Sequence, residues 1–154
     1  EWSNELLHPD AVGWDWIGIN LFDGGSLMSF KIRRNNGTTL WSDFAMLDET
    51  GHEHNLFSGR VREKRKNPKT KVNWIPIRRW TSPHSFATYP ISQKITIDTL
   101  IIEIHPLFDD QEIDARESTG GFYWEGSVGV YVSQNLIGRG FLEMTGYSKP
   151  LKLS

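Results

Sequence analysis

Apolar and polar residues alternate along most of this chain with the period of two that is typical of β-strands. Between residues 26 and 34, Leu27 and Ser29 share one face of the predicted strand, whereas Met28 and Phe30 share the other. Asp23-Gly24-Gly25 precedes this run and is typical of a hairpin turn, because Asp and Gly tolerate positive φ angles. The alternation therefore predicts a hairpin whose strands each have two faces of different composition.

Similar runs, bounded by Gly, Asn, Asp or Pro, continue to the end of the chain. The pattern predicts strands at residues 14–22, 26–34, 38–47, 52–64, 71–80, 89–97, 99–108, 122–132 and 139–147. Turns or loops are predicted at 23–25, 35–37, 48–51, 109–121 and 133–138. Helical periodicity is almost absent, and the one short candidate, residues 4–8, ends at Pro9.

Consecutive hairpins of this kind favour an all-β fold with an antiparallel up-and-down meander. Closing the meander into a barrel removes its exposed edges, so a lipocalin-like β-barrel is the predicted architecture. A β-sandwich is the alternative. The length of 154 residues suits one domain with a substantial core, and we expect a single domain over residues 1–154.

Composition narrows the function classes. The net charge is −2, and the one basic run, residues 60–71, is interrupted by Glu63, so a nucleic-acid partner is not expected. The chain has no cysteine, which excludes disulfides, thiolate metal sites and cysteine nucleophiles. Aromatic residues make up 12% of the chain, which would furnish either a barrel core or an apolar pocket.

Several segments resemble, in order along the chain, the second barrel of the hydroxyneurosporene synthase/AttH family. The segments are Glu1-Trp2-Ser3, Gly13-Trp14-Asp15-Trp16, Leu21-Phe22-Asp23-Gly24-Gly25-Ser26-Leu27-Met28, Trp80-Thr81-Ser82-Pro83, Tyr89-Pro90, Pro106 with Asp110-Gln111-Glu112, Tyr123-Trp124-Glu125-Gly126-Ser127-Val128 and residues 138–147. Together they extend over nearly the whole chain.

The resemblance implies a protein of two lipocalin-like barrels, of which this chain would be the C-terminal half. Family members include carotenoid 1,2-hydratases, secreted AttH-type proteins and more distant fungal pericyclases, which share a long apolar ligand in a barrel mouth. A bacterial periplasmic, secreted or membrane-associated location is implied by the family alone. The proposed proton-donating Asp of the hydratases would precede Glu1-Trp2, so this chain would lack it.

Glu125 and Glu143 are the candidate catalytic residues. Hydration of an alkene needs a strong general acid, and a buried carboxylic acid is suited to that role because desolvation keeps it protonated. Each Glu lies among apolar neighbours in a predicted strand, and the two would approach one another if their faces point into the barrel. The alternative is a structural role, with hydrogen bonds to Arg139, a Tyr or the backbone.

The candidate ligand-binding residues are mostly aromatic. They are Trp14, Asp15, Trp16, Trp80, Tyr123, Trp124 and Tyr147. Asp15 lies on the face opposite to both neighbouring indoles, either as a solvent-facing residue or as a polar anchor at the barrel mouth. Core packing is the favoured interpretation of the four Trp residues, and ligand stacking is the alternative.

No cofactor or metal is predicted. His52 and His54 share a strand face, but no third ligand is evident. The acidic residues 109–112 lack the spacing of a calcium loop, and no Gly-x-Ser-x-Gly motif indicates a hydrolase.

Three hypotheses remain open at this point. The first is a barrel that binds an apolar isoprenoid, polyene or lipid. The second is part of a hydratase-like lyase or cyclase that an upstream barrel of the same parent chain completes. The third is a structural barrel with a packed interior. A domain without its partner barrel would expose an apolar surface, so homodimer formation is a further hypothesis.

Overall fold

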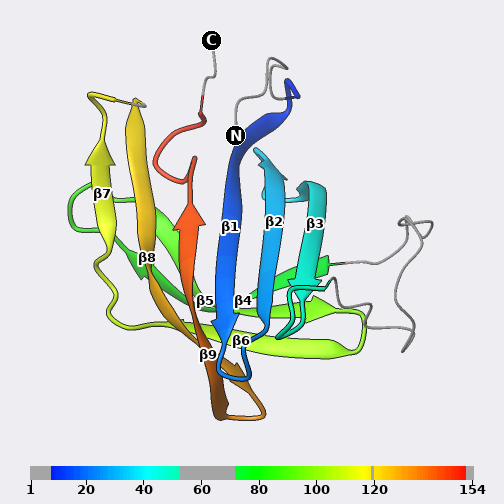
Figure 1. The fold of residues 1–154 in the computed structure, drawn as a ribbon. Helices are drawn as coiled ribbons and strands as arrows, with labels where there is room; N and C mark the ends of the chain where they lie inside the picture. The colour runs from blue at the N-terminus through cyan, green and yellow to red at the C-terminus, as the bar shows by residue number, and fades with distance from the viewer. Residues whose placement is uncertain (1–7, 53–71, 119, 152–154) are drawn as a thin grey trace.

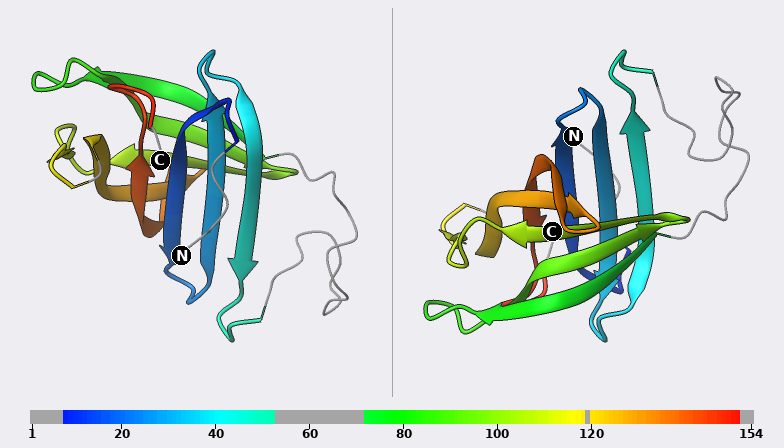
Figure 2. Two further views of the ribbon diagram at one scale, coloured as in Figure 1. Left: turned by 90° about the horizontal axis from the view of Figure 1, so that it is seen from above. Right: turned by 90° about the horizontal axis from the view of Figure 1, so that it is seen from below.

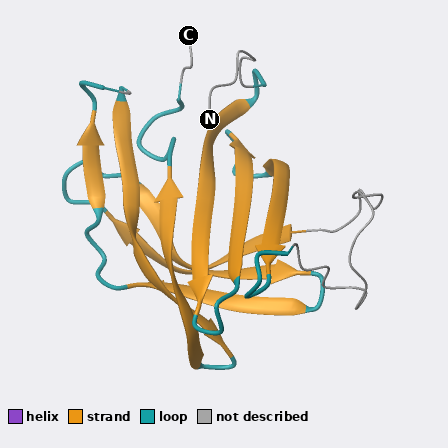
Figure 3. Cartoon of the chain, in the orientation of Figure 1, coloured by secondary structure: helices purple, strands orange, loops and turns teal. Residues whose placement is uncertain are grey.

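The computed structural model describes residues 8–52, 72–118 and 120–151. These residues form β-strands joined by turns and loops, and no helix that could cross a membrane is found among them (Figures 1 and 3). The strands are β1 (Ala11–Leu21), β2 (Ser26–Arg34), β3 (Thr39–Leu47), β4 (Val72–Thr81), β5 (Thr88–Ile97), β6 (Leu100–Pro106), β7 (Glu112–Ala115), β8 (Gly121–Val132) and β9 (Asn135–Met144).

All of these strands pair antiparallel in one curved sheet with the order β3-β2-β1-β9-β8-β6-β5-β4, and β7 pairs with β8 at the side. The first and last strands of the chain are therefore neighbours, which closes the meander at β1 and β9. The sheet curls so that β4 and β5 pass behind β1 and β2 in Figure 1, and Figure 2 shows the same arrangement from both ends. The predicted all-β, antiparallel, lipocalin-like barrel is confirmed as the fold class.

Turn chemistry explains the hairpins. Gly24 and Gly37 have φ angles of 96° and 79°, values that glycine adopts without strain. At the second of these turns, the Arg34 amide donates to the Thr38 carbonyl at 2.9 Å. Ser133 and Gln134 also have positive φ angles and form a two-residue turn between β8 and β9.

Two predicted loops differ from the structure. Of the predicted loop 133–138, only Ser133 and Gln134 form a turn, because β9 already begins at Asn135. The predicted loop 109–121 contains β7, whose four residues pair with β8. The predicted strand 52–64 lies outside the described residues apart from His52, and the predicted helix 4–8 lies outside them apart from His8.

The sheet has an inner and an outer face. On β1, the buried Asp15, Ile17 and Ile19 alternate with the half-buried Trp14 and Trp16. The inner face carries the apolar core, whose fully buried side chains include Ile17, Tyr89, Ile91, Ile95, Ile97, Ile104, Trp124, Val128, Val130, Leu142 and Met144. The face opposite the core on β8, β9, β1, β2 and β3 is called the outer face below.

Candidate functional site

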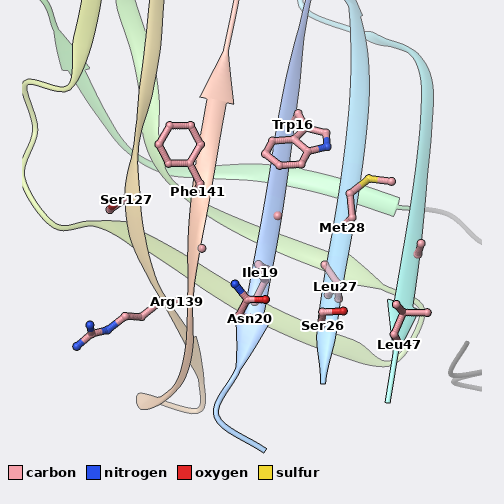
Figure 4. Close-up of a pocket in the computed structure, with 13 residues that line it drawn as sticks. Trp16, Ile19, Asn20, Ser26, Leu27, Met28, Leu47, Ser127, Arg139 and Phe141 are labelled. Carbon is pink, nitrogen blue, oxygen red and sulfur yellow. The ribbon is translucent and has the colours of Figure 1, made fainter. Parts of the chain in front are cut away.

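The outer face bears an open pocket of about 540 Å³. Trp16, Met28 and Phe141 provide large apolar side chains. Gly18 lies opposite Met28 and Phe141 in the register of the strands. Figure 4 shows these three side chains on the same side of the sheet, from β1, β2 and β9. The full lining is Trp16, Gly18, Ile19, Asn20, Ser26, Leu27, Met28, Ala45, Leu47, Ser127, Arg139, Gly140 and Phe141.

Strand register brings these residues together from distant parts of the sequence. Gly18 pairs with Met28 on β2 and with Phe141 on β9. One step along the sheet, Trp16 pairs with Phe30 on β2 and with Glu143 on β9. Side chains directly opposite on antiparallel strands lie about 5 Å apart and therefore form continuous rows.

The absence of a side chain at Gly18 makes room for the Trp16 indole. A Cβ atom at position 18 would lie 2.8 Å from the Cη2 atom of Trp16, closer than real Cβ contacts. The indole therefore lies over the backbone of β1 at the pocket floor. The position of Trp16 depends on this glycine.

The two candidate catalytic residues lie directly opposite one another, since Glu125 on β8 pairs with Glu143 on β9. Glu143 Oε1 accepts a hydrogen bond of 2.8 Å from the Trp14 indole N–H. The pKa of Glu143 is raised chiefly by burial, opposed by the Trp14 hydrogen bond, and raised further by the charge of Glu125. A raised pKa extends the pH range over which Glu143 retains its proton.

The structure places this carboxyl pair on the outer face, not inside the barrel. On β8 and β9 the fully buried Trp124, Leu142 and Met144 alternate with the half-buried Glu125 and Glu143. The two residues are direct neighbours in the strand register, but they lie outside the barrel, where Glu143 pairs with Trp16 of the pocket lining.

Aromatic side chains continue the outer face away from the pocket. The Trp14 and Phe30 ring centroids are 6.5 Å apart, and those of Phe30 and Trp41 are 5.8 Å apart. Trp41 is 49% exposed, Phe141 44% and Met28 38%. The pocket therefore belongs to a larger apolar surface across β9, β1, β2 and β3.

The inner face carries a buried charged cluster at one end of the barrel. Asp15 is fully buried, and its carboxylate lies 2.6 Å from Lys31 Nζ and 3.0 Å from Arg33 Nε. The Tyr147 hydroxyl donates to both Asp15 oxygens at 3.1 and 3.2 Å, and the Arg33 guanidinium stacks on its ring at 3.8 Å. The interpretation of Asp15 as a solvent-facing residue is therefore wrong, because alternation along β1 directs it inward.

Aromatic contacts extend this cluster toward β4 and β5. Tyr147 contacts Tyr89 with centroids 5.2 Å apart, and Tyr89 stacks with Trp80 at 6.4 Å. The Tyr89 hydroxyl donates to Glu112 at 2.7 Å. Burial, first of all, raises the pKa of both Tyr89 and Tyr147, so both phenols stay protonated at neutral pH.

The candidate ligand-binding residues thus fall into two groups. Trp14, Trp16 and the half-buried Tyr123 lie on the outer face, with Glu125 and Glu143. On the inner side lie Asp15, Trp80, Trp124 and Tyr147. Core packing is confirmed for Trp124, which is fully buried, and for Trp80, which packs against the core. For Trp14 and Trp16 it is wrong, because their face of β1 points away from the core.

Lys31 and Arg33 were not among the residues predicted from the sequence; they lie at alternate positions of β2, in line with Leu27 and Ser29. Their spacing was a usable signal, since cations on the apolar face of a strand need a buried counter-charge. Met28 and Phe141 were also missed, because only register shows that they flank Gly18.

Among the described residues, no group of three or more His, Asp and Glu is arranged to hold a metal ion. His54, one of the predicted pair, lies outside the described residues.

Comparison with known proteins gives a family match and two similar crystal structures. Residues 1–147 match the family model described as AttH-like. A protein assigned as AttH from Nitrosomonas europaea is 40% identical with a TM-score of 0.80, over 95% of this chain and 42% of that one. Kievitone hydratase from Nectria haematococca has a TM-score of 0.62 over 90% of this chain and 40% of its own, but its 16% identity shows the fold alone.

A short segment is also similar to an unrelated enzyme class. A 5'-nucleotidase from Bos taurus is 37% identical over 43 residues, which are 28% of this chain and 8% of that protein. A match of this extent carries no argument for nucleotidase activity here. This chain spans less than half the length of each of these relatives and similar structures.

Proposed function

Because the chain belongs to the AttH-like family, we propose that this domain binds an apolar small molecule of the isoprenoid, polyene or lipid class in the outer-face pocket. The observation that carries the proposal is the lining of the pocket, in which Trp16, Met28 and Phe141 surround the bare backbone of Gly18. Ligand pockets are typically apolar surfaces with a few polar groups that orient the ligand. Here Asn20 and Arg139 supply polar groups at one end.

The exposure of this surface supports a binding role. Met28, Trp41 and Phe141 are all more than a third exposed, on neighbouring strands of one face. A contiguous apolar patch on a folded domain commonly marks a ligand or partner site. A face without such a role would tend to be polar, as on other half-solvated antiparallel sheets.

We further propose that a preceding barrel of a longer parent chain covers this face and encloses the ligand. Two observations support this arrangement: the apolar surface extends beyond the pocket to Trp41, and this chain spans 42% of the Nitrosomonas protein. A second copy of this chain is the alternative cover. Sedimentation of the whole parent chain distinguishes them, because only the second predicts a concentration-dependent dimer when the preceding barrel is present.

The direct test is titration with the fluorescent polyene parinaric acid while tryptophan emission is recorded. Binding over Trp16 should quench that emission. Met28→Glu places a charge in the pocket wall and should weaken binding by at least about tenfold, because the charge would lose water on ligand binding. The matched control is Ile101→Glu on β6, since Ile101 is 50% exposed and is not part of the pocket.

Equal affinity in the wild type and Met28→Glu would contradict a site at this pocket. Absence of binding by the wild type to any polyene or lipid would favour the third hypothesis, a structural barrel without a ligand.

A second candidate function is hydration or a related lyase reaction on an isoprenoid or polyene. The observation that favours it is the Glu125–Glu143 pair, in which the raised pKa of Glu143 suits a general acid beside an apolar pocket. Trp14 and Trp16 would stabilise a carbocation through their ring faces. Incubation with an isoprenoid alkene, followed by mass spectrometry, would detect the gain of one water molecule.

Glu143→Gln is the informative variant for this reaction, because the amide oxygen still accepts the Trp14 hydrogen bond while the acidic proton is lost. Activity that persists in this variant would contradict a catalytic role for Glu143.

A further inference from the structure

The buried cluster inside the barrel contains more positive than negative charge. Lys31 and Arg33 are only 8% and 7% exposed, and among the described residues each forms an ion pair with Asp15 alone. Two cations thus share one carboxylate in a region almost without solvent. An uncompensated buried charge is costly, so this arrangement favours an additional anion.

The opposite wall of the barrel presents polar atoms without partners. Trp74 on β4 is 9% exposed and its indole N–H donates to no described residue. Gln93 on β5 is fully buried, and its side-chain oxygen Oε1 accepts no hydrogen bond from the described residues. Buried polar atoms are nearly always hydrogen-bonded, so each of these requires a partner.

The charged and unpartnered groups approach one another from β2 on one wall of the barrel and from β4 and β5 on the other. Lys31 Nζ lies over the Trp74 ring, 5.1 Å from its centroid. Gln93 Nε2 contacts Met144 Sδ at 3.8 Å, and Met144 pairs directly with Asp15. Trp74 pairs with Ile95, which places it diagonally to Gln93 on the inner face of the β4–β5 pair, roughly 7–8 Å away. A cation, a donor and an acceptor therefore surround one interior region.

We propose that this region is a second binding site, distinct from the outer-face pocket, for a small hydroxycarboxylate. The ligand's carboxylate would accept hydrogen bonds from Lys31 Nζ and from the Trp74 N–H. Its hydroxyl group would donate to Gln93 Oε1. This occupant supplies the missing negative charge and satisfies both unpartnered atoms.

Calorimetric titration with lactate, acetate and neutral lactamide tests the site. Lactate should bind, and acetate should bind about 3- to 10-fold more weakly because it lacks the hydroxyl group. Lactamide should give no measurable binding, since it lacks the charge. Binding of none of the three, with a crystal structure showing a water molecule between Trp74 and Gln93, would overturn the proposal.

Two variants locate the site. Lys31→Met should weaken lactate binding by at least about tenfold, while Arg33 still pairs with Asp15. Trp74→Phe keeps an aromatic ring but removes the N–H, and should weaken lactate binding several-fold even if Lys31→Met fails to fold. The control Lys94→Met removes a half-exposed lysine paired with Glu103 and should leave binding unchanged. Unchanged binding in both Lys31→Met and Trp74→Phe would place lactate elsewhere and overturn the proposal.

The outer-face variant Met28→Glu should bind lactate as the wild type does. This separates failure of the interior site from failure of the polyene pocket.

Discussion

Asp15 shows how one side chain connects separate parts of the chain. Its carboxylate contacts Lys31 and Arg33 on β2 and Tyr147 beyond the end of β9. All of these contacts are buried, where electrostatic interactions are stronger than at the surface and an unpaired charge is expensive. Asp15 thus joins β2 to the C-terminal segment across β1.

Asp15→Asn should destabilise the domain by about 3–5 kcal/mol, because it leaves two buried cations without their counter-charge. Urea denaturation measures this loss. The control is Asp114→Asn, whose partner Arg116 is solvent-exposed, and it should change stability little. A small effect of Asp15→Asn would contradict the view that its charge holds the cluster together.

Glu143 should give the domain a characteristic pH dependence. Its folded-state pKa is raised above the ordinary value of 4.5, chiefly by burial, so the folded state binds the proton more tightly than the unfolded chain. The stability linked to this proton is fully present below 4.5 and is lost as pH rises through the raised pKa. Glu143→Gln should therefore become progressively more stable relative to the wild type over that range.

Denaturation of both proteins at a series of pH values checks this expectation. Glu125→Gln should narrow the pH range over which the stability difference develops, because it removes the neighbouring charge that raises the pKa of Glu143. A stability difference that stays constant with pH would contradict the raised pKa.

At the scale of the elements, β1 separates two different chemistries by alternation alone. Asp15 and Ile17 face the core, and Trp14 and Trp16 face outward. The alternation in the sequence predicted these two faces of β1, and it correctly placed Asp15 opposite both indoles. Which face is buried depends on the strands that curve around it, so the Trp-rich face was wrongly assigned to the core.

Gly18→Ala should disturb the outer-face pocket without unfolding the sheet. The new methyl group would collide with the Trp16 ring, so the indole must move, at a cost of roughly 1–3 kcal/mol. Trp emission should shift and polyene affinity should fall. Gly121→Ala on β8 is the matched control, since its Cβ would meet nothing within 4 Å. Equal changes in Trp emission and polyene affinity for the two substitutions would contradict the view that Gly18 and Trp16 form the floor of the pocket.

At the scale of the whole molecule, the sheet is least continuous between β3 and β4. These strands are at opposite ends of the strand order, and between their described residues the structure gives a single long hydrogen bond, from Ser42 Oγ to the Val72 carbonyl at 3.5 Å. β1 and β9, by contrast, are each paired on both sides. The barrel should therefore open first at β3 and β4.

Hydrogen exchange measures this difference directly. Backbone amides of β1 and β9 should exchange most slowly, whereas those of β3 and β4 should exchange faster, because strands at a sheet edge open locally at lower free-energy cost. Equal protection across all four strands would show that β3 and β4 are held together more firmly than their described contacts indicate.

The sequence by itself determined the strands, most of their turns and the antiparallel barrel, because period-two alternation and positive-φ turn residues act over a few neighbouring residues. It also singled out Glu125, Glu143, Trp14 and Trp16, which the structure brings to one face. Only the tertiary structure decided which face is buried, that the pocket with Met28 and Phe141 lies outside the barrel, and that Lys31 and Arg33 enclose Asp15. These features depend on register between distant strands and on the curvature of the sheet, which no local pattern encodes.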